Sequence, residues 1–274
     1  MPALRPVPLD QLVGSVPNGA MLAVPPDYSY VAMAATRGLV RRGVRGLHLL
    51  AVPQSGIQAD LLIGAGCVET VECAAVTLGE LGPAPRFTAA VRSGRVRIKD
   101  STCPAIHAAL QASEKGLPFL PSRGIIGSDL LKVRPDWKLI SNPFPPHDPI
   151  VALPALRPDI ALFHAPFADA RGNVWIGRRR ELVTMAHAAK ASFVTVEEVR
   201  DIDLMADETL AAGALPALYV GAIAEAKQGA WPLALPSFYE ADEAELRRYA
   251  ELAASEDGFA RYLAGLAEAR HAAA

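Results

Sequence analysis

Short runs of apolar residues alternate along the chain with stretches in which apolar residues recur at helical spacing. Buried strands are predicted at 21–24, 47–52, 71–76, 96–98, 159–164, 173–176 and 191–196. Amphipathic helices are predicted at 29–42, 86–93, 105–115, 241–254 and 257–270. Strand–helix–strand order with crossovers of about a dozen residues is typical of right-handed βαβ units. The pattern therefore predicts an α/β fold with a mainly parallel sheet flanked by helices.

Domain organisation follows from the absence of a clear linker. The proline-rich stretch 143–149 is the one plausible internal boundary, and we interpret it as a loop within a single domain. We therefore expect residues 1–274 to form one domain, with a helical C-terminal segment at about 240–272.

Composition excludes several classes of protein. Hydrophobic residues make up 51% and charged residues 20%, which excludes a disordered chain. The 27 basic and 29 acidic residues give a net charge of −2, so no basic excess exists to bind nucleic acid or an anionic membrane. The runs 41–42 and 178–180 are short arginine clusters, interpreted as solvated ends of helices or loops. No apolar run is long enough to span a bilayer, and residues 1–16 lack the apolar core of a signal peptide.

The three cysteines, Cys67, Cys73 and Cys103, form neither a disulfide framework nor a zinc motif. This predicts a cytoplasmic protein without a bound metal. Cys103 follows a strand and precedes a helix, a position that favours a thiolate. It is either a nucleophile or a small buried residue.

Sequence motifs exclude some reactions and leave others open. Gly64-Ala65-Gly66 lacks the third glycine and the acidic residue of a dinucleotide loop, and neither GxxxxGK[ST] nor GxSxG is present. His164 and Asp169 near one strand end are either an acid–base pair or a strand cap and a turn. Among the carboxylates that flank strands, Glu80 and Asp100 are candidates for catalysis.

Several segments in order resemble the A-type chain of family I CoA-transferases of the glutaconate type. They are 59–72, 79–87, the Leu-Pro-Phe-Leu-Pro stretch within 116–129, 151–159, His164 with 168–173, and 229–232 with Tyr239 and Asp242. The resemblance covers nearly the whole chain. It implies the CoA-transferase superfamily fold (NagB/RpiA-like) and a B-type partner subunit, often in an A2B2 heterotetramer. It also implies that the partner carries the nucleophilic glutamate, with a CoA thioester as substrate and no permanently bound cofactor.

A related branch of the superfamily hydrolyses a C–C bond of steroid-derived CoA thioesters with a glutamate of its A-type chain. Cys103 aligns with that glutamate here, and Asp100 is the nearest acid. The family's Gly-Gly-aromatic loop appears as Val24-Pro25-Pro26-Asp27-Tyr28-Ser29-Tyr30, so backbone N–H donors are lost. Relatives in the family carry a stretch that contains a glutamate. Residues 142–147 stand in its place here, and they contain no glutamate. We therefore expect a rebuilt pocket.

The expected substrate-binding residues lie in loops near strand ends. They are Gly64, Gly66, Gly124, Gly127, Ser128, Asp129, Tyr28, Tyr30 and His147, while Asp100, Glu80 and Cys103 are the catalytic candidates. Three functions remain open: the A-type chain of a CoA-transferase, a hydrolase that uses a carboxylate of this chain, and a non-catalytic scaffold or sensor.

Overall fold

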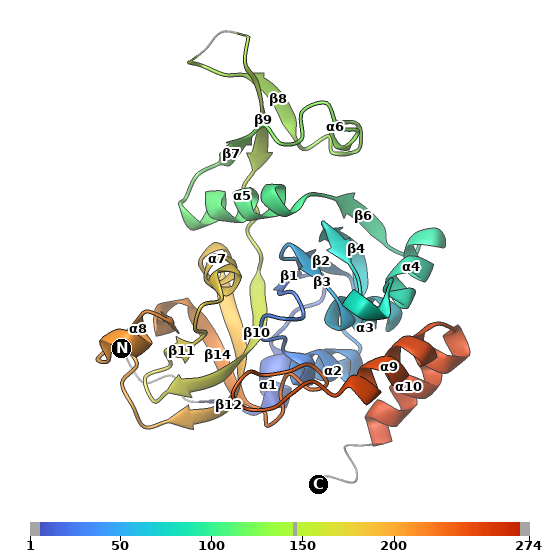
Figure 1. Ribbon diagram of the computed structural model, residues 1–274, viewed down its shortest axis with the longest axis vertical. Helices are drawn as coiled ribbons and strands as arrows, with labels where there is room; N and C mark the ends of the chain where they lie inside the picture. Colours follow the sequence, from blue (N-terminus) through green and yellow to red (C-terminus); the bar gives the residue numbers. More distant parts are fainter. Residues whose placement is uncertain (1–5, 145–146, 269–274) are drawn as a thin grey trace.

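The computed structural model describes residues 6–144 and 147–268, and its body is built on one nine-stranded sheet (Figure 1). The strands are β1 (Met21–Val24), β2 (Leu47–Ala51), β4 (Val68–Cys73), β6 (Arg97–Asp100), β10 (Ile160–Asp169), β11 (Val174–Trp175), β12 (Ala191–Arg200), β13 (Ala214–Leu215) and β14 (Val220–Glu225). The helices of the body are α1 (Leu9–Gly14), α2 (Met33–Arg42), α3 (Ile57–Gly64), α4 (Pro85–Arg92), α5 (Cys103–Glu114), α7 (Arg180–Ala188), α8 (Glu208–Ala211), α9 (Glu243–Ala253) and α10 (Glu256–Glu268). The predicted α/β fold is confirmed.

The order of the parallel strands places a crevice at a defined point of the sheet. Neighbouring strands follow the order β6-β4-β2-β1-β10-β12-β14, and every pair along it is parallel. The chain builds outward from β1 through β2 to β6, and then returns to the other side of β1 with β10. Strand order therefore reverses between β1 and β10, where loops diverge and ligands bind in open α/β sheets.

Both faces of the sheet are covered, because alternate strand residues point to opposite sides. Leu22 and Val24 of β1 pack in one apolar cluster with residues of α1 to α4, whereas Ala23 packs in a second cluster with residues of α5 and α7. The C-terminal helices α9 and α10 pack against α2 and α3 in a third cluster that contains Tyr249 and Phe259. The predicted C-terminal helices are confirmed through residue 268, and residues 269–272 lie outside the described part of the chain.

A three-stranded antiparallel sheet projects from the body above α5 (Figure 1). It consists of β7 (Phe119–Ser122), β8 (Lys138–Ser141) and β9 (Pro149–Pro154), and with α6 (Leu130–Val133) it forms what we call the projecting unit. Val151, Leu153 and Trp137 form its small core with Ala105 of α5. Of the stretch 143–149, interpreted from sequence as a loop, Pro149 begins β9 and the other described residues lie between β8 and β9, while residues 145–146 lie outside the described chain.

Four short elements complete the body. The pair β3 (Gln54–Ser55) and β5 (Ala75–Val76) is parallel, and it is followed by the 3₁₀ turn η1 (Gly79–Leu81). A second 3₁₀ turn, η2 (Ala217–Tyr219), precedes β14. No helix of the described residues is long and apolar enough to cross a membrane.

Candidate functional site

The loop that follows β1 lies at the point where strand order reverses. Its two prolines, Pro25 and Pro26, are buried, whereas the Tyr28 side chain is 67% exposed. Tyr30 is buried and has a left-handed backbone (φ 58°). The Tyr30 carbonyl accepts a hydrogen bond from the backbone N–H of His164 at 2.6 Å, which fastens the loop to β10. The structure therefore places the predicted residues Tyr28 and Tyr30 at the crevice.

Two side chains of this loop lie near two side chains of α5 and one of α7. We call these five residues the crevice cluster: Tyr28, Ser29, Cys103, His107 and Glu181. The Ser29 hydroxyl donates to the Glu181 carboxylate in the first turn of α7. Cys103 is exposed at the start of α5, and His107 lies one turn further along the same helix face. Burial, with the nearby charges of Glu181 and Cys103, raises the pKa of Tyr28. Burial lowers the pKa of His107, and Glu181 opposes that shift.

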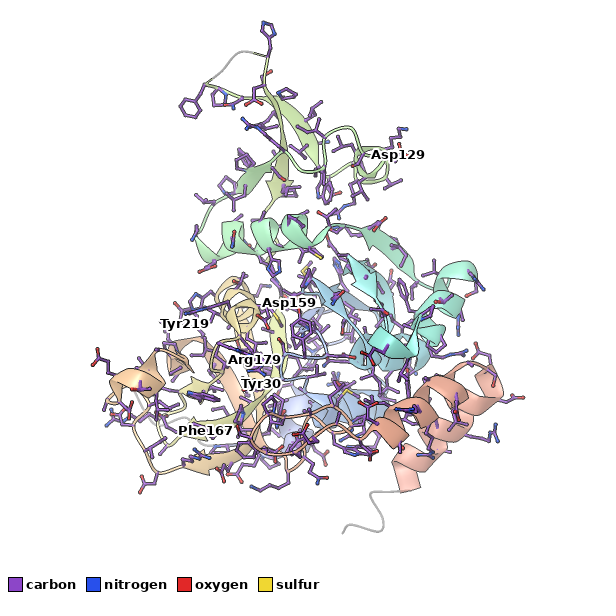
Figure 2. The ribbon with its side chains drawn as sticks, in the orientation of Figure 1. Tyr30, Asp129, Asp159, Phe167, Arg179 and Tyr219 are labelled. Atoms are coloured by element: carbon purple, nitrogen blue, oxygen red, sulfur yellow. The ribbon has the colours of Figure 1, made fainter. Side chains whose placement is uncertain are left out.

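A second set of side chains lines a groove of about 700 Å³ on the other side of Tyr30. This arginine groove is lined by Tyr30, Pro166, Phe167, Trp175, Gly177, Arg178, Arg179, Arg200, Pro236, Ser237 and Phe238. The Arg179 guanidinium carbon lies 3.5 Å from the centre of the Tyr30 ring, and that of Arg200 lies 3.9 Å from the Phe167 ring. Figure 2 shows Tyr30 and Arg179 next to one another near the middle of the body, with Phe167 beyond them.

Positive charge in the arginine groove is only partly compensated. No carboxylate lines it, and Arg200 alone of its three arginines has an ion-pair partner among the described residues, Glu198 at 2.7 Å. Arg178 is exposed, and the buried Arg179 Nε has no hydrogen-bond acceptor in the described chain. Burial lowers the pKa of Arg179. Such a groove attracts anions.

Two of the four non-glycine residues with positive φ in the described chain line the same groove. Tyr30 (φ 58°) and Ser237 (φ 69°) both adopt the left-handed conformation that non-glycine residues rarely occupy. Each such residue costs of the order of 1 kcal/mol, and strain of this kind persists mainly where surrounding structure holds it for function. Strain, charge and aromatic surface therefore coincide at one place.

A smaller pocket of about 220 Å³ is lined by the same loop together with residues of β3, η1, α9 and the start of α3. Asp27 enters it, and its Oδ2 accepts from the N–H of Ile57 at the start of α3. Its Oδ1 is buried without a hydrogen-bond partner in the described chain, as is the hydroxyl of Ser55. Burial raises the pKa of Asp27 from 3.8 to about 6. Gly56 is required here, since a Cβ would overlap the Asp27 carboxylate.

His164 and Asp169 do not form an acid–base pair. The fully buried His164 contacts Glu197 (Nε2 to Oε1, 3.0 Å) and Thr195 (Nδ1 to Oγ1, 2.8 Å). Burial lowers the pKa of His164, so the imidazole is neutral and donates to an ionised Glu197. Although burial opposes it, hydrogen bonds from His164, Gly229 and Tyr239 lower the pKa of Glu197 to about 2. This network ties β10 and β12 to residues 228–239.

Asp169 holds the turn that follows β10. Its carboxylate accepts from the backbone N–H groups of Arg171, Asn173 and Leu204 and from the Asn173 side chain. The interpretation of Asp169 as a residue that bonds its own turn is therefore confirmed, whereas His164 is neither a strand cap nor an acid–base partner of Asp169, because it lies inside β10.

The predicted glycines and their neighbours lie away from the crevice. Gly64 is the last residue of α3 rather than a loop residue, and a Cβ there would overlap Phe259 of α10. Gly66 (φ 71°) lies just before the N-terminal end of β4, whereas the crevice lies at the C-terminal end of β1. Gly124, Gly127, Ser128 and Asp129 belong to the projecting unit, where Figure 2 shows Asp129 beside α6 and far from Tyr30. Asp129 is exposed and pairs with Lys132 at 2.6 Å.

The remaining candidates are dispersed as well. His147 (φ 65°) lies in the segment between β8 and β9 of the projecting unit. Asp100 is exposed at the end of β6, where its side chain accepts from the N–H of Ser101. Glu80 is exposed on η1, beside the small pocket but not in its wall. The structure thus brings Tyr28 and Cys103 together in the crevice cluster and places Tyr30 in the same loop as Tyr28, whereas the other predicted residues lie elsewhere, Glu80 beside the small pocket that Tyr28 also lines.

Sequence reasoning missed the residues that give the crevice its charge. Arg178 and Arg179 lie between β11 and α7, just before the helix begins at Arg180, and Glu181 lies in the first turn of that helix. Their signal was the arginine run after a predicted strand, which we interpreted as solvated. Asp27 also carried a signal, because an acid between two prolines and two tyrosines in a strand-end loop is unusual. Among the described residues, no group of three His, Cys, Asp or Glu could hold a metal ion.

Known proteins resemble the chain over most of its length. No family model matches it. The chain is 31% identical to the A-type chain of 3-oxoadipate CoA-transferase from Pseudomonas knackmussii over 255 residues, 90% of this chain and 88% of that protein. It is 31% identical to the A-type chain of glutaconate CoA-transferase from Acidaminococcus fermentans over 245 residues, 82% and 75% of the two chains. It is also 31% identical to the cholesterol ring-cleaving hydrolase IpdA subunit of Mycobacterium tuberculosis over 248 residues, 84% and 82%.

A further relative and two solved structures extend the comparison. An uncharacterized protein of Archaeoglobus fulgidus is 33% identical over 235 residues, which are 85% of this chain, and the chain spans 52% of that protein's length. The crystal structure of a variant of the decarboxylase AibA/AibB superposes with a TM-score of 0.85 at 29% identity, over 98% of this chain and 100% of that chain. Glutaconate coenzyme A-transferase from A. fermentans superposes with a TM-score of 0.84 at 26% identity, over 93% and 86%.

Proposed function

Because the chain belongs to the family of A-type CoA-transferase chains, we propose that it forms, with a B-type partner, an enzyme acting on acyl-CoA thioesters. The observation that carries the proposal is the match to the A-type chain of 3-oxoadipate CoA-transferase over 90% of this chain and 88% of that one. The fold agrees, with a TM-score of 0.84 to glutaconate coenzyme A-transferase. The acyl-CoA is the substrate, and no cofactor stays permanently bound.

The crevice supports a role in holding substrate rather than in attacking it. Among the carboxylates at the crevice, Asp27 is held by the N–H of Ile57, and Glu181 accepts from Ser29. Glu197, deeper in the body, accepts from His164. A nucleophile must be free to reach the thioester carbon. We therefore propose that the nucleophilic glutamate belongs to the B-type partner and that this chain helps to bind the substrate.

The proposed reaction is a ping-pong transfer. The partner's glutamate attacks the thioester, the CoA thiolate leaves, and it then attacks the resulting anhydride to give a glutamyl-CoA thioester and the free acyl carboxylate. An acceptor carboxylate reverses these steps and takes the CoA. The crevice cluster and the arginine groove would bind the substrate on this chain's side, and two copies of each subunit would form an A2B2 assembly.

The test uses this chain co-purified with a B-type CoA-transferase subunit encoded beside it. The complex is incubated with a panel of acyl-CoAs, with and without acetate or succinate, and the CoA species are followed by mass spectrometry. The proposal expects a new acyl-CoA only when an acceptor is present. Intact acyl-CoAs in every sample would overturn it.

A hydrolase is the second candidate, because the ring-cleaving hydrolase subunit is equally similar at 31% identity over 84% of this chain. Cys103 aligns with the glutamate of that branch, and the nearest acid, Asp100, is exposed three residues earlier. In the same experiment a hydrolase would release free CoA, or a CoA ester heavier by one water, without any acceptor. An Asp100→Asn variant would lose that activity if Asp100 supplied the base.

A further inference from the structure

The small pocket that Asp27 enters contains polar groups that the proposed reaction at the thioester does not use. We propose that this pocket receives the far end of the acyl group and selects acyl chains that end in a primary ammonium group. The proposal rests on the proposed function, since an acyl-CoA must be the substrate. It adds the class of acyl group, which the reaction at the thioester does not determine.

Two residues that line the pocket each have a buried polar atom without a partner in the described chain. They are Asp27, through Oδ1, and Ser55, through its hydroxyl; Ser55 is only 2% exposed. Buried polar atoms normally have a hydrogen-bond partner, so these two atoms point to a group that the described chain does not supply. A primary ammonium has three N–H donors and no acceptor, so it can donate to a carboxylate and to a hydroxyl oxygen together.

The charge of the pocket is negative. Among the described residues that line it, Asp27 alone is charged. Burial is the largest cause of the pKa of Asp27 rising to about 6, and the charge of Asp60 adds to the rise. At pH 7.5 the carboxyl is therefore mostly ionised. Because folding has already removed it from water, a bound cation is attracted without a further desolvation of Asp27, whereas a terminal carboxylate is repelled.

The start of α3 holds the Asp27 carboxyl in one position. The N–H of Ile57 donates to Oδ2. Gly56 leaves the necessary room, because a Cβ there would overlap the carboxylate. The carboxyl is therefore a fixed part of the pocket, and Oδ1 is left for a ligand.

Apolar side chains form most of the remaining wall and suit a chain of methylene groups. They are Pro26, Leu78, Leu81, Leu233 and Leu246. A dry cavity of about 150 Å³ holds benzene, so the pocket, at about 220 Å³, has room for a chain of roughly six to eight non-hydrogen atoms. A short linear acyl group that ends in an ammonium falls within that range.

Tyr28 joins the pocket to the crevice cluster. It lines the pocket, and in the cluster it lies near Cys103 and Glu181. An acyl-CoA whose thioester lies at the crevice can therefore extend its acyl chain past Tyr28 towards Asp27. Two relatives are named for 3-oxoadipate and glutaconate, which are dicarboxylates. The carboxylate of Asp27 predicts a different class of acyl group for this chain.

The test offers the two-subunit complex three acids of equal chain length as CoA acceptors at pH 7.5. They are 5-aminopentanoate, pentanoate and glutarate, whose far ends are an ammonium, a methyl group and a carboxylate. The donor is an acyl-CoA that the complex consumes in the transfer experiment, and its loss is measured. We expect kcat/KM for 5-aminopentanoate to exceed that for each of the other acids at least about tenfold.

Two variants separate the charge from the hydroxyl. Asp27→Asn keeps an oxygen for the Ile57 N–H. It should lower kcat/KM for 5-aminopentanoate at least about tenfold and raise that for glutarate, a gain that a misfolded variant would not show. Ser55→Ala should lower the value for 5-aminopentanoate about threefold. The matched control is Asp257→Asn, an exposed aspartate in the first turn of α10, which should change neither value.

Direct binding tests the pocket without catalysis. In calorimetry, pentylammonium should bind the wild-type complex more tightly than 1-pentanol does, and Asp27→Asn should weaken its binding at least about tenfold. Use of glutarate equal to or better than that of 5-aminopentanoate would overturn the proposal. Binding of pentylammonium that Asp27→Asn leaves unchanged would overturn it as well.

The two proposals fail in different ways. If the complex transfers CoA without preferring 5-aminopentanoate, the assignment of the pocket is wrong and the proposed function stands. If no acyl-CoA reacts under any condition but Asp27→Asn abolishes the binding of pentylammonium, the proposed function is wrong and the pocket remains a site for a cation. If the complex neither reacts nor binds pentylammonium, both proposals are wrong.

Discussion

Asp27 is a carboxylic acid whose surroundings disfavour its own charged form. Its carboxyl is held in place by the N–H of Ile57, while its second oxygen is buried without a partner in the described chain. Burial is the largest cause of the pKa rising to about 6. A carboxyl whose pKa is higher in the folded state stabilises the fold most below the unfolded value. That stability is lost as pH rises through about 6.

An Asp27→Asn variant tests this effect of burial. Asparagine keeps an oxygen for the Ile57 N–H and carries no charge. The shift from 3.8 to about 6 corresponds to about 3 kcal/mol, so the variant should be more stable than the wild type at pH 8 by up to that amount. The difference should shrink towards pH 4. Urea unfolding at both values measures it, and a difference independent of pH would contradict the assignment.

Single residues also show why the site was only partly predictable. Tyr28 and Tyr30 were found because they stand in the loop that replaces the family's Gly-Gly-aromatic loop, and Cys103 because it lies between a predicted strand and the start of a helix. Arg178 and Arg179 were interpreted as solvated, because a run of like charges says nothing about what folds over it. Tyr30 from the β1 loop and Phe238 from residues 226–242 complete that groove, and no local pattern links positions so far apart.

At the scale of elements, a buried ion pair joins the projecting unit to the body. Arg134, which follows α6, lies 2.7 Å from Glu72 of β4, and both side chains are almost fully buried. Arg134 also donates to the carbonyl of Asp100 at the end of β6. Although burial opposes it, hydrogen bonds and charges from His48, Arg134 and Lys99 lower the pKa of Glu72.

Arg134→Met should therefore cost about 3 kcal/mol of unfolding free energy at pH 7, because it leaves Glu72 buried without its closest cation. The loss should diminish as pH falls through the folded pKa of Glu72, when the carboxyl becomes neutral. Chemical denaturation at several pH values measures both effects. Arg123→Met, which removes an exposed arginine paired with Asp148, is the control and should cost under about 1 kcal/mol. Equal losses in the two variants would show that burial of the Glu72 pair adds nothing.

Helices and strands whose apolar residues recur with a clear period were predictable, and those without such a period were not. Strand β1 and helix α9 matched their patterns closely. Helix α3 was missed because every residue from Ile57 to Ile63 is buried, so no amphipathic period exists to detect. The projecting sheet was missed because β7 and β8 are short and half exposed, and β7 contains a proline.

At the scale of the whole molecule, substrate binding is expected at one surface. The β1 loop and the N-terminal ends of α5 and α7 converge at the crevice, and Tyr28 is exposed there beside Cys103 and Glu181. If the acyl-CoA lies across this surface in the complex with a B-type partner, changing Tyr28 must affect catalysis without affecting folding.

The most direct measurement is kcat/KM for an acyl-CoA substrate of the two-subunit complex with Tyr28→Ala. Leu218→Ala serves as control, because Leu218 is similarly exposed at 71% but lies on η2, away from the crevice. We predict that Tyr28→Ala lowers kcat/KM at least about tenfold, the effect of losing roughly 1.4 kcal/mol of binding, with an unchanged melting temperature. The control should match the wild type. Wild-type kcat/KM in the Tyr28→Ala complex would contradict the placement of the substrate at this crevice.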